Sequence, residues 1–304
     1  MKLIEDYREY LNLHYNNEGS VIGYISDAVS LIDFLAEKKF SQPFAKLNEV
    51  HRGRVAGSLT LTEYYLYLNE QQKSFSAATV NRRISSHKKF IYFLYENSFI
   101  EKDFSGEIKS IRLNTKSKSY LSEEECLELI ESCKGMNLKR DRAIIALLLF
   151  SGLRVNEIRN LKRSDINDNY LYVQTSENDE RKVELNDALR AILSDFIISD
   201  RNYAHDNLFC NSTGNHLSLR TIHQIIKKHL SACDIHQKGI GSEVLRRTGA
   251  NLLIKYSDAS ISEIKNYLGH KNISTTENYF ESNDVLNIRD LNNNPVAKGI
   301  VKMI

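Results

Sequence analysis

The chain has 304 residues, 41% hydrophobic and 26% charged, which excludes a wholly disordered chain and predicts about two domains of roughly 150 residues. Its 41 basic and 39 acidic residues nearly cancel, and its four cysteines form no CxxC pair, which argues against a zinc site or a disulfide framework. The longest wholly apolar run, Ala143–Phe150, has eight residues, whereas a membrane helix needs about 18. The N-terminus has acidic residues where a signal peptide would have its apolar stretch. We therefore expect a cytoplasmic protein with no membrane partner.

The first hundred residues are predicted to be helical. Apolar residues recur at helical spacing over 22–35, and the stretch 59–68 has the same character. A strong third helix is expected to begin after Ser76 and to continue to about Glu96.

This third helix lies in a basic stretch, since residues 73–118 contain ten Lys and Arg against four Asp and Glu. Its apolar positions leave much of the cylinder to basic residues, which suits a helix that lies along a nucleic-acid backbone. The alternative is a solvated helix face balanced by acidic residues elsewhere. The candidate DNA contacts on this helix are Arg82, Arg83, Lys88 and Lys89.

A basic, polar segment separates the two predicted domains. The apolar periodicity fades after Gly106, and we place a linker at 109–119, with Lys116 and Lys118 as further candidate DNA contacts.

The C-terminal tail has apolar residues without an obvious partner in its own segment, so we expect it to pack either on its own domain or in a neighbouring protomer. The expected organisation is a helical domain at 1–108, a second domain at 120–285 and a tail at 286–304.

The second domain is predicted to be mainly helical with one small β-hairpin. Ser122 and Glu125 have the spacing of a capping box, which predicts the start of a helix. Two short strands, Tyr170–Val173 and Lys182–Leu185, flank a polar turn at 176–180. Helices are expected on both sides of the hairpin, at 123–133, at 139–150 and from Asp187 onward.

Four short motifs in the second half combine residue types that suit phosphate chemistry. In Ser-Gly-Leu-Arg-Val-Asn-Glu, a glycine ends an apolar helix, Arg154 follows, and Glu157 lies about one turn later. Leu-Arg-Arg-Thr contains Arg246. Leu-Gly-His ends at His270, and Ser-Thr-Thr-Glu-Asn-Tyr then places Tyr279 nine residues after this histidine.

The order and spacing of these motifs closely resemble the tyrosine recombinases, the family of phage integrases and Xer-like enzymes. The resemblance covers about 120–285 through motifs and extends more loosely to the basic N-terminal helix. It implies a helical core-binding domain, a mixed α/β catalytic domain, and a homotetramer on two DNA duplexes. The implied reaction is site-specific cleavage and rejoining of DNA through a 3′-phosphotyrosyl link, with no metal or cofactor. The alternatives are a type IB topoisomerase and a catalytically inactive DNA-binding regulator derived from a recombinase.

The resemblance also implies roles for the motif residues. Arg154 and Arg246 match the arginines that grip the scissile phosphate, where fork-shaped donors stay charged at any relevant pH. His270 matches a histidine that hydrogen-bonds this phosphate, and Tyr279 matches the nucleophile, whose hydroxyl needs neighbours that ease its ionisation. Glu157 is expected to brace Arg154, or else to be a first-turn acid favoured by the helix dipole.

Two positions depart from the family pattern. The residue three before the second arginine is usually histidine, and here it is Glu243, whose carboxylate near a phosphate must be neutralised by the arginines or protonated. The family presents a lysine in the hairpin turn, where it protonates the leaving 5′-oxygen, but 176–180 contains none. Of the nearest cations, Arg181 and Lys182, we take Lys182 as the candidate general acid. Arg247 is expected to be structural or to contact the DNA backbone.

The biological programme is left open, because integration, dimer or transposon resolution, and inversion would use the same residues. Little room exists before the helical 1–108 unit for a further arm-binding domain. We therefore expect a compact, Xer-like or transposon-resolution enzyme rather than an integrase that bridges distant arm sites.

Overall fold

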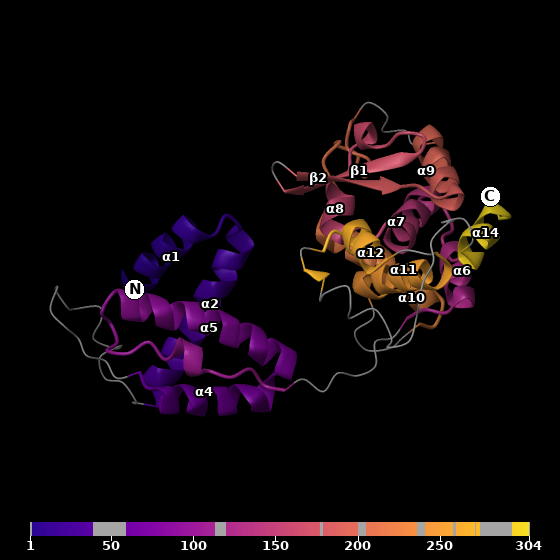
Figure 1. The fold of residues 1–304 in the computed structure, drawn as a ribbon. Helices are drawn as coiled ribbons and strands as arrows, with labels where there is room; N and C mark the ends of the chain where they lie inside the picture. The colour runs from indigo at the N-terminus through magenta and orange to yellow at the C-terminus, as the bar shows by residue number, and fades with distance from the viewer. Residues whose placement is uncertain are drawn as a thin grey trace. The chain divides into compact units, whose positions relative to one another are not determined.

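The computed structural model describes residues 2–38, 59–112, 120–176, 179–199, 205–235, 241–257, 260–270, 272–273 and 294–303. Its internal contacts divide the chain into two compact units, Met1–Lys116 and Ser117–Ile304 (Figure 1). Both units are mostly helical, and the described β-structure of the second includes a two-stranded sheet.

The first unit is a helical bundle around an aromatic core. Side-chain caps start three of its helices, from Asn17, from Thr60 in a capping box with Glu63, and from Ser76. Tyr7 and Phe90 are among the fully buried residues between the helices. The elements are α1 (Lys2–His14), α2 (Glu18–Glu37), α4 (Leu61–Ser74), α5 (Ala77–Glu96) and the 3₁₀ helix η1 (Ser105–Glu107).

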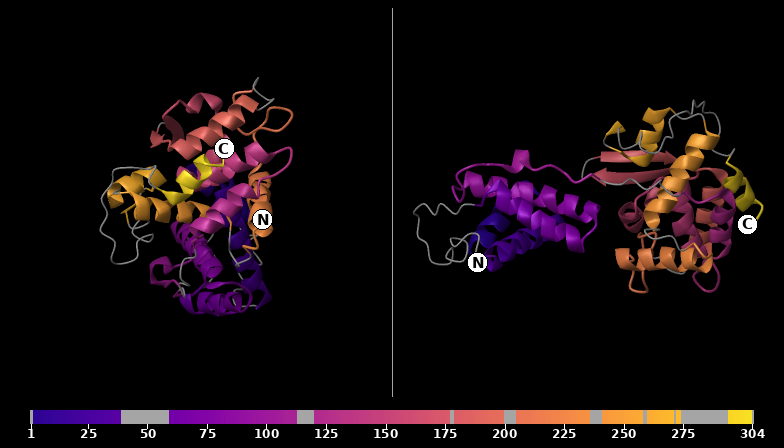
Figure 2. Two further views of the ribbon diagram at one scale, coloured as in Figure 1. Left: turned by 90° about the vertical axis from the view of Figure 1, so that its right-hand side faces the viewer. Right: turned by 90° about the horizontal axis from the view of Figure 1, so that it is seen from below.

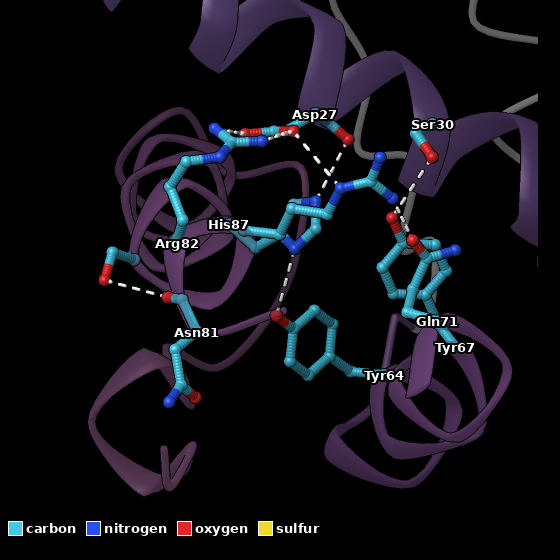
Figure 3. A network of polar contacts seen from close by, with 10 residues as sticks. Asp27, Ser30, Tyr64, Tyr67, Gln71, Asn81, Arg82 and His87 are labelled. Atoms are coloured by element: carbon cyan, nitrogen blue, oxygen red, sulfur yellow. Dashed lines mark hydrogen bonds and ion pairs between the residues drawn. The ribbon is translucent and has the colours of Figure 1, made fainter. Parts of the chain in front are cut away.

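A buried carboxylate fixes α5 against α2 (Figure 3). Asp27 is 3% exposed, and its oxygens accept from Arg82 Nη1 and Nη2 at 2.7 and 2.8 Å. Arg83 Nε lies 3.7 Å from Asp27 Oδ1, and the His87 ring bonds both the Asp27 carbonyl and the Tyr64 hydroxyl.

By length and composition alone, α2 is the one described helix that could cross a membrane. Its packing and its part in the Asp27 network are those of a core helix of the first unit.

The second unit is built around α7. Each residue from Ala143 to Phe150 is buried, and α7 packs against α9, α10 and α11 (Figures 1 and 2). The capping box predicted at Ser122 and Glu125 is confirmed at the start of α6. The elements are α6 (Glu123–Glu131), α7 (Leu138–Phe150), α8 (Val155–Asn160), the 3₁₀ helix η2 (Arg163–Asp165), β1 (Tyr170–Ser176), β2 (Asp179–Glu184), α9 (Asp187–Ser199), α10 (Leu219–Ala232), α11 (Ser242–Tyr256), α12 (Ile261–Leu268) and α14 (Pro295–Val301).

The hairpin is longer than predicted. β1 continues to Ser176 and β2 starts at Asp179, so residues expected in the turn pair as strand, with an irregular register between Gln174 and Ser176. Polar residues can extend a ladder in this way because its hydrogen bonds use backbone groups alone. Arg181 pairs with Val173, and Lys182 pairs with Tyr172. These neighbouring cations therefore point to opposite faces of the sheet.

The tail helix α14 packs on its own unit, against α6 and α9. Val296 and Ile300 are fully buried there, whereas Val301 is 48% exposed. Ile304 lies outside the described residues. The sequence predicts that the tail packs either on its own domain or in a neighbouring protomer. In this single chain, it packs on its own domain.

Candidate active site

A tight turn between α7 and α8 places the first motif arginine. Gly152 has φ +60°, and a Cβ there would lie 2.9 Å from Leu268 and 3.1 Å from the Tyr267 ring of α12. Both the backbone angle and the close approach require glycine. The turn thereby sets Arg154 at the N-cap of α8, beside the C-terminal end of α12.

Arg154 is held from two sides. Its Nη1 and Nη2 donate to the Gly269 carbonyl at 3.3 and 3.4 Å, and Nη1 also lies 3.4 Å from Glu157 Oε1. Glu157 Oε2 accepts the backbone N–H of Arg154 at 2.7 Å, so this residue both caps α8 and braces the guanidinium. The Arg154 side chain is still 48% exposed, which leaves donors accessible from solvent.

The other two motif residues meet the same end of α12. Arg246 on α11 is 2% exposed and donates from Nη2 to the Leu268 carbonyl at 2.6 Å. Gly269 closes α12 with φ +61°, and His270 follows it with 7% exposure. The C-terminal carbonyls of a helix carry partial negative charge. They hold both guanidinium groups next to the imidazole.

Burial and the nearby cations together determine the charge of His270. Burial, followed by the charges of Arg246, Arg154, Arg181 and Lys265, lowers the pKa of His270 to about 4. The ring is therefore neutral near pH 7, and it can donate one hydrogen bond and accept another. A neutral donor suits a site where the two arginines already supply positive charge.

The hairpin brings Arg181 into this cluster. Arg181 Nη2 donates to Glu157 Oε2 at 3.0 Å, and the side chain is 11% exposed. Lys182, our candidate general acid, is exposed on the other face, with Nζ 3.4 Å from the centre of the Tyr170 ring. Strand alternation is the sequence signal that could have placed Arg181, rather than Lys182, in this cluster. Arg181 lies on the same face of β2 as Val183, which is buried.

The remaining candidate residues of this unit differ in position. Glu243 is exposed in the first turn of α11, three residues before Arg246, and its carbonyl accepts from Arg247 Nε at 3.4 Å. Arg247 is partly exposed. Tyr279 lies outside the described residues, as do the linker lysines Lys116 and Lys118.

On the basic helix α5, the four candidate DNA contacts are not equivalent. Arg82, although 54% exposed, is paired with Asp27, and Arg83 is 17% exposed and lies over the Phe75 ring at 4.0 Å. Lys88 and Lys89 are partly exposed, and Lys89 lies over the rings of Tyr15 and Tyr24. The lysines therefore test DNA contact more cleanly than arginines that also neutralise a buried carboxylate.

We expect the Lys88→Gln, Lys89→Gln double variant to weaken binding to all DNA sequences. Each lost phosphate contact should reduce the slope of log affinity against log salt by about 0.9. Fluorescence anisotropy over a salt series measures this slope. Lys139→Gln, at a lysine paired with Asp195 in the second unit, is the matched control. An unchanged slope in the double variant would mean that this helix face does not contact phosphates.

Known proteins are similar to this chain in sequence. Residues 119–285 match the phage integrase family. The chain is 31% identical over 247 residues to tyrosine recombinase XerC of Caldanaerobacter subterraneus subsp. tengcongensis, covering 79% of this chain and 70% of the relative. The chain belongs to the phage integrase family of tyrosine recombinases. The resemblance drawn from the motifs is confirmed, and with it the class of enzyme, a DNA strand transferase of site-specific recombination.

Solved structures confirm the fold class of this recombinase. A lambda integrase dimer bound to a core site superposes with a TM-score of 0.71 at 18% identity, over 95% of this chain and 99% of that one. A lambda integrase tetramer bound to a Holliday junction gives a TM-score of 0.69 at 18% identity, over 90% and 77% of the two chains. The relatives do not favour the topoisomerase or the inactive regulator.

Proposed function

We propose that this recombinase breaks and rejoins DNA with Tyr279 as the nucleophile and with Arg154, Arg246 and His270 on the scissile phosphate. The observation that carries the proposal is the convergence of these last three residues on the C-terminal end of α12. Two guanidinium groups and a neutral imidazole form a donor set for a phosphate that gathers negative charge in the transition state.

The geometry supports a simple way for the two arginines to take up the scissile phosphate when DNA binds. The contacts of Arg154 with the Gly269 carbonyl are long, at 3.3 and 3.4 Å, and the side chain is half exposed. An anionic phosphate oxygen is a stronger acceptor than a neutral carbonyl, so DNA can draw these donors away. Arg246 is buried and already oriented by Leu268, which reduces the reorganisation needed when DNA binds.

In the proposed reaction, the Tyr279 oxygen attacks phosphorus while the bond to the 5′-oxygen breaks. The tyrosine proton passes to an acceptor, and the leaving oxygen takes up a proton, which yields a 3′-phosphotyrosyl link and a 5′-hydroxyl. A 5′-hydroxyl of a partner strand then attacks the link and restores the tyrosine, so one phosphoester bond is exchanged for another. Lys182, the candidate donor to the leaving oxygen, is exposed on the face of the sheet opposite Arg181, so nothing in the described geometry of this single chain places it at the phosphate.

The proposal places this chemistry in a homotetramer on two DNA duplexes in the cytoplasm. The tetrameric lambda integrase on a Holliday junction supports the assembly by similarity of fold. The similarity to XerC supports an Xer-like enzyme.

Trapping a covalent adduct tests the proposed function. DNA sites are first selected for binding from a random-sequence library, and a nick is then placed next to the cleavage position, so that the cleaved end diffuses away. We expect an adduct that resists SDS and disappears after protease treatment, with the protein on the 3′-phosphate. Specific binding without adduct on any nicked site would reject strand cleavage and favour a DNA-binding regulator.

Glu243 provides a separate prediction, because it stands where the family has histidine. If its carboxylate accepts the tyrosine proton, Glu243→Gln should slow adduct formation markedly, by about 10²-fold, and Glu243→His should preserve the rate. If it only positions a neighbour, the Gln variant should be nearly silent. Rate constants on the nicked site distinguish these outcomes, and two silent variants would remove Glu243 from the mechanism.

A further inference from the structure

Arg181 lies on the inner face of the hairpin, where it contacts the supports of the phosphate-binding residues. It is on β2 opposite Val173 of β1, and its side chain is 11% exposed. A buried guanidinium requires a partner charge. Here the partner is Glu157, which is also 11% exposed, with Arg181 Nη2 and Glu157 Oε2 3.0 Å apart.

Glu157 is shared between two arginines. Its Oε2 accepts from Arg181 Nη2 and from the backbone N–H of Arg154, and its Oε1 faces Arg154 Nη1 at 3.4 Å. Arg181 therefore offsets part of the negative charge on this carboxylate. Without Arg181, the same carboxylate would be buried with Arg154 as its main cation, which would hold the Arg154 side chain away from DNA.

Arg181 also covers the turn that follows α12. A Cβ on Gly269 would lie 2.9 Å from Arg181 Nη1 and 3.1 Å from its Cζ and Nε, so the flat guanidinium rests against this glycine. The carbonyl of Gly269 orients Arg154, and the next residue is His270. One side chain thus contacts both supports of Arg154 and the turn that carries the histidine.

We propose that Arg181 is a positioning residue of the recombination site, which links the hairpin to Arg154 through Glu157 and to His270 through Gly269. The proposal rests on the proposed roles of Arg154 and His270 at the scissile phosphate. The role requires the planar fork of arginine, because a lysine keeps the charge but has no flat face to cover Gly269. It differs from general-acid catalysis, because Arg181 acts through other residues and transfers no proton.

The cleavage test compares Arg181→Gln, Arg181→Lys, Glu157→Gln and the Arg181→Gln, Glu157→Gln double variant on the nicked site. We expect Arg181→Gln to slow adduct formation about 10²-fold, as misplaced catalytic groups do. Site-specific DNA binding should stay within about twofold, and Arg181→Lys should recover part of the rate. The double variant should be no slower than the slower single variant, because both changes remove the same link. Additive losses, or parent-like cleavage by Arg181→Gln, would overturn the proposal.

Two controls separate a positioning role from a general effect of surface charge and from proton donation. Arg190→Gln removes an arginine that pairs with Asp187 on the exposed side of α9, and it should cleave like the parent. A DNA site with sulfur in place of the leaving 5′-oxygen needs no general acid, because a thiolate leaves without a proton. Rescue of Arg181→Gln on this DNA would identify Arg181 as a proton donor and reject the positioning role.

A measurement without DNA tests the same geometry even if no adduct forms. Burial lowers the pKa of His270 most, to about 4, and the charge of Arg181 adds to this effect with those of Arg246, Arg154 and Lys265. In Arg181→Gln, an NMR titration of the His270 ring should show a higher pKa than in the parent, because one of the charges that lower it is removed. The Arg190→Gln control should show none. A pKa that stays unchanged in a folded Arg181→Gln protein would contradict the contact with the histidine turn. Loss of adduct in the parent, with the expected NMR shift present, would reject the proposed function alone.

Discussion

Replacing Tyr279 with phenylalanine is expected to abolish covalent attachment to DNA while leaving site-specific binding nearly unchanged. The variant lacks the single oxygen that would form the phosphotyrosyl bond, and it keeps the size and apolar character of the ring. Loss of a nucleophile lowers turnover by about 10⁴-fold or more in enzymes that form covalent intermediates. Adduct formation on the nicked site, resolved by denaturing gel, measures the effect.

The informative control for Tyr279→Phe is a second tyrosine variant in the same unit. Tyr256 is partly buried, and its hydroxyl donates to Glu123, so Tyr256→Phe removes one hydroxyl that holds helices together. We expect this variant to form adduct at the parental rate. If the Tyr279→Phe protein still formed an adduct that resists SDS, another tyrosine would be the nucleophile, and peptide mapping of the adduct would identify it.

Loss of either arginine that we propose to bind the scissile phosphate is expected to have the second largest effect. Arg154→Ala should lower the cleavage rate by about 10²–10³-fold, the cost of removing one preorganised donor from other oxyanion sites. Its side chain is 48% exposed, so the fold should survive the change. Single-turnover cleavage with saturating protein measures the rate separately from DNA binding.

Arg246→Ala should lower the cleavage rate to a similar extent, but it should also destabilise the second unit. Arg246 is 2% exposed and its Nη2 bonds the Leu268 carbonyl, so truncation leaves a cavity and an unpaired carbonyl. Arg246→Lys keeps the charge and most of the volume, and it should still cleave far more slowly than the parent because the fork is lost. Parental cleavage by a folded Arg246→Lys protein would show that charge alone is sufficient.

Local residue patterns were sufficient to predict several features of this protein. The caps at Ser76 and Ser122, the apolar periodicity of α2 and α5 and the apolar run of α7 are local features, so they are visible in the amino-acid sequence. The motif spacing around Arg154, Arg246 and His270 was likewise sufficient to identify the family, because this order of residues is rare by chance.

Long-range packing determined which neighbouring side chains serve the site and which serve the core. Arg181 and Lys182 are adjacent in sequence, and only the pairing of β2 with β1 determines that Arg181 faces Glu157. Likewise, no local pattern shows that Arg82 neutralises Asp27, a residue 55 positions earlier. Similarly, buried His229 bonds Asp141, 88 positions away. Such pairs form because a buried charge or polar group must find a partner wherever packing brings one close. Short-range sequence patterns therefore identified the residues of the candidate active site, and long-range packing determined which other side chains hold those residues in place.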